Sequence, residues 1–279
     1  MSPELTYAVL IPIHKPNEFF DEALASIIDD VDETIPIYLI LHKPNLQLQS
    51  FISTSHFFER LILLESNALT LGGCLNDALS RISEDFVFRM DSDDIWLKGR
   101  FAIQTNYLKK YPHAAVICGG LTVRNTLTSN SHSLKAKALT KLSIWDFLKD
   151  CPVKHPTVLY NRQKIIIAGG YNPTLQATED YELWTRVISK FEIILVPEIL
   201  LSYRVHSGSQ SSVFENEQMA ETALIRETAA CNLLRIRKCH SVHGLEAKTN
   251  CRLRIMIVHF LLKVFQRTVI EVKKGVTYN

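Results

Sequence analysis

The sequence predicts an α/β protein with a mostly parallel central sheet flanked by helices, followed by a C-terminal helical extension. Two observations predict this class. Over about the first hundred residues, short apolar runs rich in β-formers alternate with segments that are apolar on one helical face. Such alternation implies parallel strands joined by right-handed helical crossovers. A chain of 279 residues with 47% hydrophobic residues is also long and apolar enough to bury a sizeable core.

The first part of the chain contains four expected strands with helices between them. The apolar run 7–13, closed by Pro12, is typical of a strand buried on both faces. Asn17 is expected to cap a helix over 18–28. The other elements expected here are strands over 37–41, 61–64 and 86–90, a helix that ends near residue 58, and a helix over 72–82 that opens on Gly72 and Gly73.

Beyond residue 100 the pattern is looser, and the chain contains no internal repeat. The expected helices cover 100–110, 144–149, 163–168 and 179–189; the expected strands cover 115–118, 157–160, 193–196 and 201–205, and 125–133 is expected to be a polar loop. Ligands of such sheets bind where the strands end at their carboxyl edge. Polar groups at those ends are therefore the candidates for function.

Charge is divided unevenly along the chain. Lys and Arg number 31 against 29 Asp and Glu, but residues 231–279 hold ten basic and two acidic residues, a net charge of +8 that leaves −6 for residues 1–230. We therefore predict a main domain over 1–213 and a basic, amphipathic helical extension over 214–279. An acidic body joined to a basic but apolar segment argues against nucleic acid as a partner.

Within the extension, residues 252–268 are apolar around all but one narrow polar stripe at helical spacing, so this surface must be covered. One interpretation is a helix that packs on the body or on the partner subunit of a homodimer. The other is docking on an anionic membrane face, where the surrounding Lys and Arg would gain about 1 kcal/mol each from lipid headgroups. The sequence leaves both open.

Neither the N-terminus nor the cysteines indicate export. The start lacks the basic residues of a signal peptide, and no apolar stretch reaches the roughly 18–20 residues of a spanning helix. The six cysteines are scattered without a C-x-x-C pair, which is typical of free thiols rather than disulfides or zinc ligands. We expect a cytoplasmic protein, or one on the inner face of the cytoplasmic membrane.

The most informative segment runs from the expected strand 86–90 directly into Asp91, Asp93 and Asp94. Two carboxylates at i and i+2 can face one Mg²⁺ or Mn²⁺ ion that keeps open positions for substrate phosphates. The alternative is an acidic turn that caps the next helix, the role we favour for Asp94 itself. A calcium loop is excluded by Trp96 and Ala102, and an aspartyl-phosphate motif is excluded by Ile95.

A second acidic pair, Glu179 and Asp180, begins an expected helix after Thr178. Acids in a first turn complement the helix dipole, with Thr178 as the cap, and this position would keep Asp180 ionised. A carboxylate here could also take a proton from an attacking hydroxyl. Upstream, Gly169 and Gly170 follow a helix, where a C-cap is the stronger interpretation and close approach to a sugar the weaker one.

Taken in order, these motifs resemble a family 2 glycosyltransferase of the GT-A fold, of the type found in bacterial polysaccharide and lipopolysaccharide biosynthesis. The resemblance covers roughly residues 5–212 and is carried by 9–14, Asn67 with Gly72, Gly73 and Asn76, 89–94, Arg100 and Phe101 with Gln104, 155–158, 169–171, 179–184 and 203–206. The acidic triplet alone is a weak signal, whereas the ordered series is specific.

The resemblance implies a role for each matching residue. Asp91 would bind the sugar-nucleotide, Asp93 would bind Mn²⁺ or Mg²⁺, and His206 would be a further metal ligand or a surface histidine. Asp180, the second acid of its pair, would be the catalytic base. The remaining residues of the donor side would be Pro12, His14, His42, Asn67, Asn76, Arg89 and Ser92; those of the acceptor side would be His155, Gly170, Tyr171 and Glu179.

One departure limits the resemblance. Relatives present Asp-Gly after the second strand to read the nucleotide base, whereas this chain has His42, Lys43 and Pro44. The expected function is inverting transfer of a sugar, from a UDP-sugar by default, to a hydroxyl of a glycan or lipid-linked glycan. A silent GT-A scaffold in a glycan assembly complex is the main alternative; a sugar nucleotidyltransferase and a glycoside hydrolase are the others.

Overall fold

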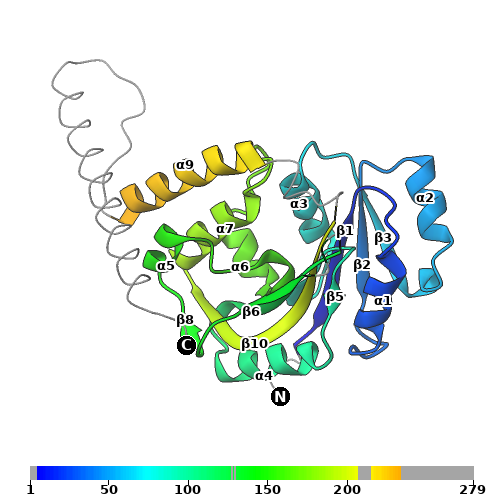
Figure 1. Ribbon diagram of the computed structural model, residues 1–279, viewed down its shortest axis with the longest axis horizontal. Coiled ribbons are helices and arrows are strands. Elements are labelled where there is room, and N and C mark those ends of the chain that lie inside the picture. The colour runs from blue at the N-terminus through cyan, green and yellow to red at the C-terminus, as the bar shows by residue number, and fades with distance from the viewer. Residues whose placement is uncertain (1–4, 127, 129, 207–214, 234–279) are drawn as a thin grey trace, which may run out of the picture.

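The computed structural model describes residues 5–126, 128, 130–206 and 215–233. Its elements form one mixed sheet with helices on both faces (Figure 1). The strands follow the order β3-β2-β1-β4-β9-β6-β10-β5, with β7 paired to β6 and β8 paired to β10. The predicted α/β class with a mostly parallel sheet flanked by helices is confirmed.

The N-terminal part of the sheet is parallel. β1 (Tyr7–Ile13) lies between β2 (Ile37–His42) and β4 (Phe86–Arg89), and β3 (Leu61–Ser66) pairs with β2 at the edge. Nearly all residues of β1 and β4 are buried, which is why their sequences are continuous apolar runs rather than alternating ones. These four strands are the four that the sequence predicted.

The C-terminal part of the sheet is mixed. The short β9 (Leu159–Asn161) runs antiparallel to both β4 and β6 (Ala114–Asn125), while β10 (Glu192–Val205) runs parallel to β6. β5 (Ile95–Trp96), β7 (Ser131–Leu134) and β8 (Thr140–Lys141) complete the sheet. The two strands predicted over 193–196 and 201–205 are one strand, because register shifts between Leu195 and Leu201 absorb Pro197 without ending the pairing.

Helices cover each face of the sheet. α1 (Phe20–Ile28), α2 (Leu46–Ser53) and α4 (Arg100–Lys110) belong with one apolar core, whereas α3 (Leu71–Arg81), α5 (Ile144–Lys149), α6 (Arg162–Ile167) and α7 (Glu179–Ile188) belong with the other. Two single turns, Phe58–Arg60 and His155–Thr157, lie between them. α9 (Glu215–Leu233) packs on α5 and α7, as Figure 1 shows in yellow.

The ends of two helices correct details of the sequence prediction. Asn17 accepts the N–H of Phe19, the residue directly before α1, at 3.1 Å, and the side chain of the N-cap residue itself makes no capping bond. α4 begins at Arg100 after Gly99, and its cap comes from the turn that follows α1: the Asp30 carboxylate accepts the N–H groups of Gly99 at 2.6 Å and Phe101 at 3.0 Å. A cap supplied from so far along the chain leaves no local sequence signal.

The predicted extension is described only in part. Of residues 214–279, the structure describes α9, so the segment 252–268 and both of its interpretations, packing and membrane docking, lie outside the described residues. Among the helices that are described, none combines the length and the apolar character needed to cross a membrane. Cys74, Cys118 and Cys151 are free thiols, as expected.

Candidate active site

The site is built around the end of β4, where Arg89 is held by Asp91. The Arg89 guanidinium meets the carboxylate with both nitrogens, Nη1 to Oδ2 at 2.8 Å and Nη2 to Oδ1 at 2.6 Å. The Arg89 side chain is 3% exposed, whereas that of Asp91 is 29% exposed. Burial raises the pKa of Asp91 and the Arg89 charge opposes that rise. The ion pair therefore fixes one carboxylate at the sheet edge with part of its surface open to a ligand.

Asp93 faces His206 across the same edge. Its Oδ2 lies 2.9 Å from His206 Nε2, with side chains 26% and 16% exposed. Between the two aspartates, Ser92 Oγ accepts a hydrogen bond from Asn17 Nδ2 at 3.2 Å, which ties the loop after β1 to the acidic turn. Residues from three distant parts of the chain thus converge where β1, β4 and β10 end.

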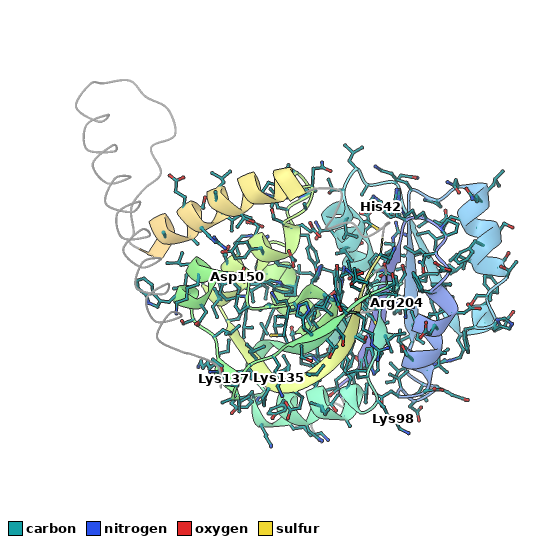
Figure 2. All side chains as sticks on the ribbon, viewed as in Figure 1. His42, Lys98, Lys135, Lys137, Asp150 and Arg204 are labelled. Carbon is teal, nitrogen blue, oxygen red and sulfur yellow. The ribbon has the colours of Figure 1, made fainter. Side chains whose placement is uncertain are left out.

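Asp94 has a different role from the predicted helix cap. It is fully buried, and its Oδ1 accepts the N–H of Arg204 at 2.9 Å, so it joins the turn after β4 to the end of β10. Figure 2 labels Arg204 near the centre of the molecule. Burial, with the charges of Asp91 and Asp93, raises the pKa of Asp94 well above its usual value. Because Arg204 stands two residues before His206, this bond also sets the position of the histidine.

A buried arginine, Arg100, supports the acidic turn after β4 from the interior of the protein. Arg100 donates from Nε to Gln104 at 2.9 Å and from Nη2 to the Arg89 carbonyl at 3.0 Å, and its guanidinium stacks 4.1 Å above the Trp96 ring. Burial lowers the pKa of Arg100 to about 9. Arg100 and Gln104, which belong to the motif series that carries the resemblance, are fully buried and therefore shape the site from the interior.

The second acidic pair begins α7. Burial raises the pKa of Glu179 to about 8, with Asp180 adding to the rise, and the Glu179 side chain has an oxygen, Oε2, without a hydrogen-bond partner among the described residues. Burial also raises the pKa of partly exposed Asp180, offset in part by the Tyr181 N–H and by the charges of Arg89 and Lys154. Desolvation is the largest effect on the pKa of Asp180, and main-chain N–H groups at the start of α7 oppose it. The expectation that this position keeps Asp180 ionised stays a prediction.

Thr178 does not cap α7 with its side chain. Its Oγ1 donates at 2.6 Å to Glu221 of α9, a contact between segments that the sequence analysis placed in separate domains. Arg89 links the acidic pair to the acidic turn, because its charge acts on Asp180 and Glu179 as well as on Asp91. The candidate nucleotide-binding carboxylate, Asp91, is in contact with Arg89, and the Arg89 charge also acts on the candidate base, Asp180.

Three residues predicted on the acceptor side, His155, Tyr171 and Glu179, are buried. Tyr171 is 1% exposed and His155 is 7% exposed, and Tyr171 Oη lies 2.8 Å from His155 Nε2. Burial holds the pKa of His155 well below its usual range, so this histidine is neutral. Glu179 is 6% exposed. Trp184 packs edge-on against His155 and is part of the core. The acceptor-side roles of His155, Tyr171 and Glu179 stay predictions.

Gly170 closes α6, the interpretation that the sequence favoured. Its N–H donates to the Ile165 carbonyl and the Gly169 N–H donates to that of Ile166, both near 3 Å, which is a Schellman motif. Asn76, predicted on the nucleotide-sugar side, binds the main chain of Tyr171 with both ends of its amide, at 2.8 Å each. A residue of α3 thus holds the loop that leads toward Asp180.

The remaining residues predicted to bind the nucleotide-sugar lie on or just after β1, β2 and β3. His14 Nδ1 lies 2.9 Å from the His42 carbonyl, and the two rings are 5.1 Å apart. His42, labelled in Figure 2, is nearly buried, and its Nε2 lies 3.0 Å from the Ala68 carbonyl. Burial lowers the pKa of His42. Pro12 is buried in β1, and Asn67 is exposed just after β3.

Lys43 adopts φ +54°, a left-handed conformation that favours glycine. The turn after β2, where this chain departs from the Asp-Gly that the resemblance implies, therefore contains a non-glycine residue in a left-handed conformation.

Asp93 and His206 fit a divalent cation shared with a substrate. They offer one oxygen and one nitrogen ligand, from the segments that follow β4 and β10. Within the described part of the chain, no three His, Cys, Asp or Glu side chains gather closely enough to hold a metal ion by themselves. A cation held by one or two protein groups and by phosphate oxygens is the arrangement that Mg²⁺ uses in phosphate-binding enzymes. The donor set fits such a shared cation, not a closed protein cage.

Sequence reasoning missed several residues of the site. Lys154 places a positive charge near Asp180, and Glu221 and Arg226 of α9 contact the residues around it. Nothing in the local sequence distinguishes them from solvated charges, because each acts through a contact with a distant segment.

The chain belongs to the family described as glycosyltransferase like family 2, whose model matches residues 8–244. An uncharacterised glycosyltransferase of Haemophilus influenzae is 28% identical over 218 residues, 74% of this chain and 79% of that protein. The amylovoran biosynthesis glycosyltransferase AmsE of Erwinia amylovora is 34% identical over 149 residues, 53% of this chain and 54% of AmsE. The chain is therefore a glycosyltransferase, as the motif series predicted.

Solved structures agree on the fold. Residues 1–349 of S. aureus TarS in complex with UDP-GlcNAc superpose with a TM-score of 0.66 at 13% identity, covering 92% of this chain and 73% of that one. The mannosyltransferase PcManGT from Pyrobaculum calidifontis, in complex with GDP-Man and Mn²⁺, gives 0.61 at 12% identity, covering 99% and 77%. At these identities the likeness establishes the GT-A fold.

Proposed function

We propose that this glycosyltransferase moves a sugar from a nucleotide-sugar to a hydroxyl of a glycan or lipid-linked glycan, with inversion at the anomeric carbon. The observation that carries the proposal is the position of Arg89, which pairs with Asp91 and also acts on Asp180. A carboxylate suited to bind the nucleotide-sugar and a carboxylate suited to take a proton are thereby held near one buried charge. A single displacement requires these two roles, binding of the nucleotide-sugar and removal of the acceptor proton, and here different carboxylates would supply them.

In this proposal the acidic turn binds the nucleotide-sugar. Asp91 would contact the nucleoside side, and Asp93 with His206 would hold Mn²⁺ or Mg²⁺. Such a cation, when bound, would neutralise charge on the departing diphosphate. The structures of TarS with UDP-GlcNAc and of PcManGT with GDP-Man and Mn²⁺ support a nucleotide-sugar and a divalent metal. UDP is the default nucleotide, and His42 leaves the base open to test.

The acceptor is proposed from the relatives and from charge. The AmsE relative is described as an amylovoran biosynthesis enzyme, which supports a polysaccharide acceptor. The net charge of +8 over residues 231–279 supports an acceptor that is lipid-linked at an anionic membrane face. The −6 body then carries the chemistry, and the basic segment brings it to the acceptor.

Asp180 is the proposed base. As the acceptor oxygen forms its bond to the anomeric carbon, the bond from that carbon to the diphosphate breaks, and the hydroxyl proton passes to the Asp180 carboxylate. A base benefits from a pKa nearer to the working pH, and partial burial moves the pKa of Asp180 in that direction. Glu179, with a pKa of about 8, stays protonated near neutral pH and does not compete for the role.

The test replaces Asp180 by Ala and by Asn in the full chain. Binding of UDP-GlcNAc and GDP-Man with Mn²⁺ is measured by thermal shift, and turnover is measured as release of nucleoside diphosphate. We expect turnover to fall by about 10²- to 10⁴-fold, with affinity for the nucleotide-sugar changed less than about twofold. The control is Asp29→Ala, an exposed aspartate at the end of α1, which should leave both unchanged.

The alternative is a silent scaffold, which the missing base-reading Asp motivates. It predicts that no nucleotide-sugar stabilises the wild-type protein in the presence of Mn²⁺. Full turnover in Asp180→Ala would refute the assigned base, whereas loss of turnover with intact binding would exclude the scaffold.

A further inference from the structure

Glu221 of α9 binds the loop that leads into the acidic pair. Its Oε2 accepts from Thr178 Oγ1 at 2.6 Å and from the Ala177 N–H at 3.4 Å, and its Oε1 accepts from the Gln176 N–H at 3.2 Å. One carboxylate thus takes three donors from three consecutive residues. Hydrogen bonds to an ionised acceptor are among the stronger ones in proteins.

Arg226, on the same helix, contacts the residue just after Asp180. Its Nε lies 3.3 Å from Tyr181 Oη, and that hydroxyl donates to the Phe147 carbonyl of α5. Arg226 Nη2 also lies 3.8 Å from Asp150, which Figure 2 labels beneath α9. Through Tyr181 the helix therefore reaches the downstream neighbour of Asp180 as well.

Glu221 and Arg226 thus contact the residues on both sides of the acidic pair that contains Asp180, the proposed base. Upstream of Glu221's bonds, the loop is held by Thr70 Oγ1, which donates to the Pro173 carbonyl at 3.0 Å, and by Asn76 at Tyr171. Residues 176–178, immediately before the acidic pair, depend on Glu221 for the three bonds described above. The contacts of Glu221 and Arg226 are with this loop and with Tyr181, so the helix can act on Asp180 through the segments that flank it.

We propose that Glu221 is a positioning residue for Asp180, and that α9 is part of the catalytic apparatus of the main domain. Arg226 assists it from the other side through Tyr181. The inference rests on the proposed role of Asp180. It also moves the functional limit of the main domain past the predicted boundary at 213/214, because the catalytic loop is incomplete without α9.

The test compares Glu221→Ala and Glu221→Gln with a matched control, Glu227→Ala, in the full chain. Glu227 is a partly buried glutamate of the same helix for which the described residues show no hydrogen bond to the loop. Turnover is release of nucleoside diphosphate from UDP-GlcNAc or GDP-Man with Mn²⁺. We expect Glu221→Ala to lower kcat by about 10- to 100-fold with KM for the nucleotide-sugar unchanged, because small misplacements of a reacting group have effects of that size.

The conservative variant should recover part of the rate. The Gln side chain keeps one carbonyl acceptor for the loop but loses the second acceptor oxygen and the charge, so kcat should lie between the wild-type value and that of Glu221→Ala. Glu227→Ala should match the wild type. A purely stabilising role for Glu221 would lower Tm while leaving kcat per folded molecule unchanged, and that result overturns the proposal.

Amide hydrogen exchange supplies a readout that needs no substrate. Loss of the Glu221 bonds should speed exchange at Gln176 and Ala177 by about tenfold or more, with the strands of the sheet unaffected. Unchanged exchange over residues 176–181 in Glu221→Ala overturns the proposal.

A double-mutant cycle separates this inference from the assignment of the base. If Glu221 acts through Asp180, Glu221→Ala should lower kcat less than about twofold in an Asp180→Asn background. A further loss of 10-fold or more there means that Glu221 acts independently, which sinks the positioning role alone. Full activity of Asp180→Asn by itself sinks the proposed base, and the inference falls with it.

Discussion

Arg89 shows how a single buried charge organises an acidic site. Burying a guanidinium is unfavourable unless the charge is paired, and here both terminal nitrogens face the Asp91 carboxylate. The same charge lowers the pKa of Glu179 and Asp180, which burial raises more strongly. Arg89 therefore allows several acids to lie close together, and it explains why an arginine follows three apolar residues at the end of β4.

The raised pKa of Glu179 gives a prediction for stability. A carboxyl whose pKa rises from 4.5 to about 8 on folding stabilises the folded state fully below pH 4.5, and this contribution is lost as pH rises toward 8. With metal chelated, we expect the free energy of unfolding of the wild type to fall by on the order of 2 kcal/mol between about pH 6 and about pH 7.5. Glu179→Gln should not show this fall. Urea unfolding at both pH values measures it.

His155 makes the opposite contribution in a different range. Its pKa is lowered on folding, so the stability it contributes is present above its usual value of 6.5 and is lost as pH falls below that. Its effect is therefore small in the upper part of the range used for Glu179. Equal pH slopes for the wild type and Glu179→Gln would contradict the raised pKa of Glu179.

At the scale of elements, the link from α6 to α7 depends on a glycine. Gly170 has φ +63°, and a Cβ atom there would lie 2.6 Å from Asn76 Oδ1. Asn76 uses that oxygen to accept the Tyr171 N–H. The glycine therefore allows both the end of α6 and the hydrogen bond that joins the loop to α3.

Gly170→Ala should be destabilising for both reasons. The left-handed conformation costs about 1 kcal/mol, and displacement of the Asn76 amide should add about 1–2 kcal/mol. The matched control is Gly99→Ala, which has φ +87° but open space, since the nearest atom to its Cβ would be 3.9 Å away. The difference in stability between the two variants, measured by thermal unfolding, isolates the contribution of Asn76. Equal losses of stability would show that the left-handed backbone conformation accounts for the whole effect.

The sequence predicted most elements because their patterns are local. α4 and α5 begin and end where expected, and the four parallel strands are continuous apolar runs bounded by polar turns. β5, β7 and β8 were missed because they are two to four residues long. β5 and β8 pair with the distant β10, whereas β7 pairs with nearby β6 but begins within the polar segment expected to be a loop. β10 was divided in two because Pro197 is compatible with a strand only where the register shifts.

At the scale of the whole molecule, the ends of β1, β4 and β10 converge on one edge of the sheet. A ligand that bridges those ends should stabilise the entire fold, since anything that binds only the folded state raises apparent stability. Asp93 after β4 and His206 after β10 are the groups that a bound cation would join.

Mn²⁺ together with a nucleotide-sugar should therefore raise Tm, by an amount that grows with ligand concentration and corresponds to about 2.7 kcal/mol at a hundred times Kd. Asp93→Ala should lose this shift, and EDTA should abolish it in the wild type. Asp180→Asn serves as the control, because the proposed base does not hold the cation and its variant should keep the shift. A full Mn²⁺-dependent shift in Asp93→Ala would remove Asp93 from the metal site.

The sequence by itself determined the α/β class, the positions of the main elements and the family, because apolar periodicity and ordered motifs are properties of neighbouring residues. It also named the acidic turn and the acidic pair as the chemical groups. Only the tertiary structure decided which of these groups lie in the interior and what they contact: Tyr171 and His155 are buried, Asn76 binds the main chain of Tyr171, and Asp94 accepts the N–H of Arg204. The contacts of Glu221 with the loop before Asp180 likewise join residues more than forty positions apart. Burial and long-range hydrogen bonds depend on the packing of distant segments, which no local pattern records.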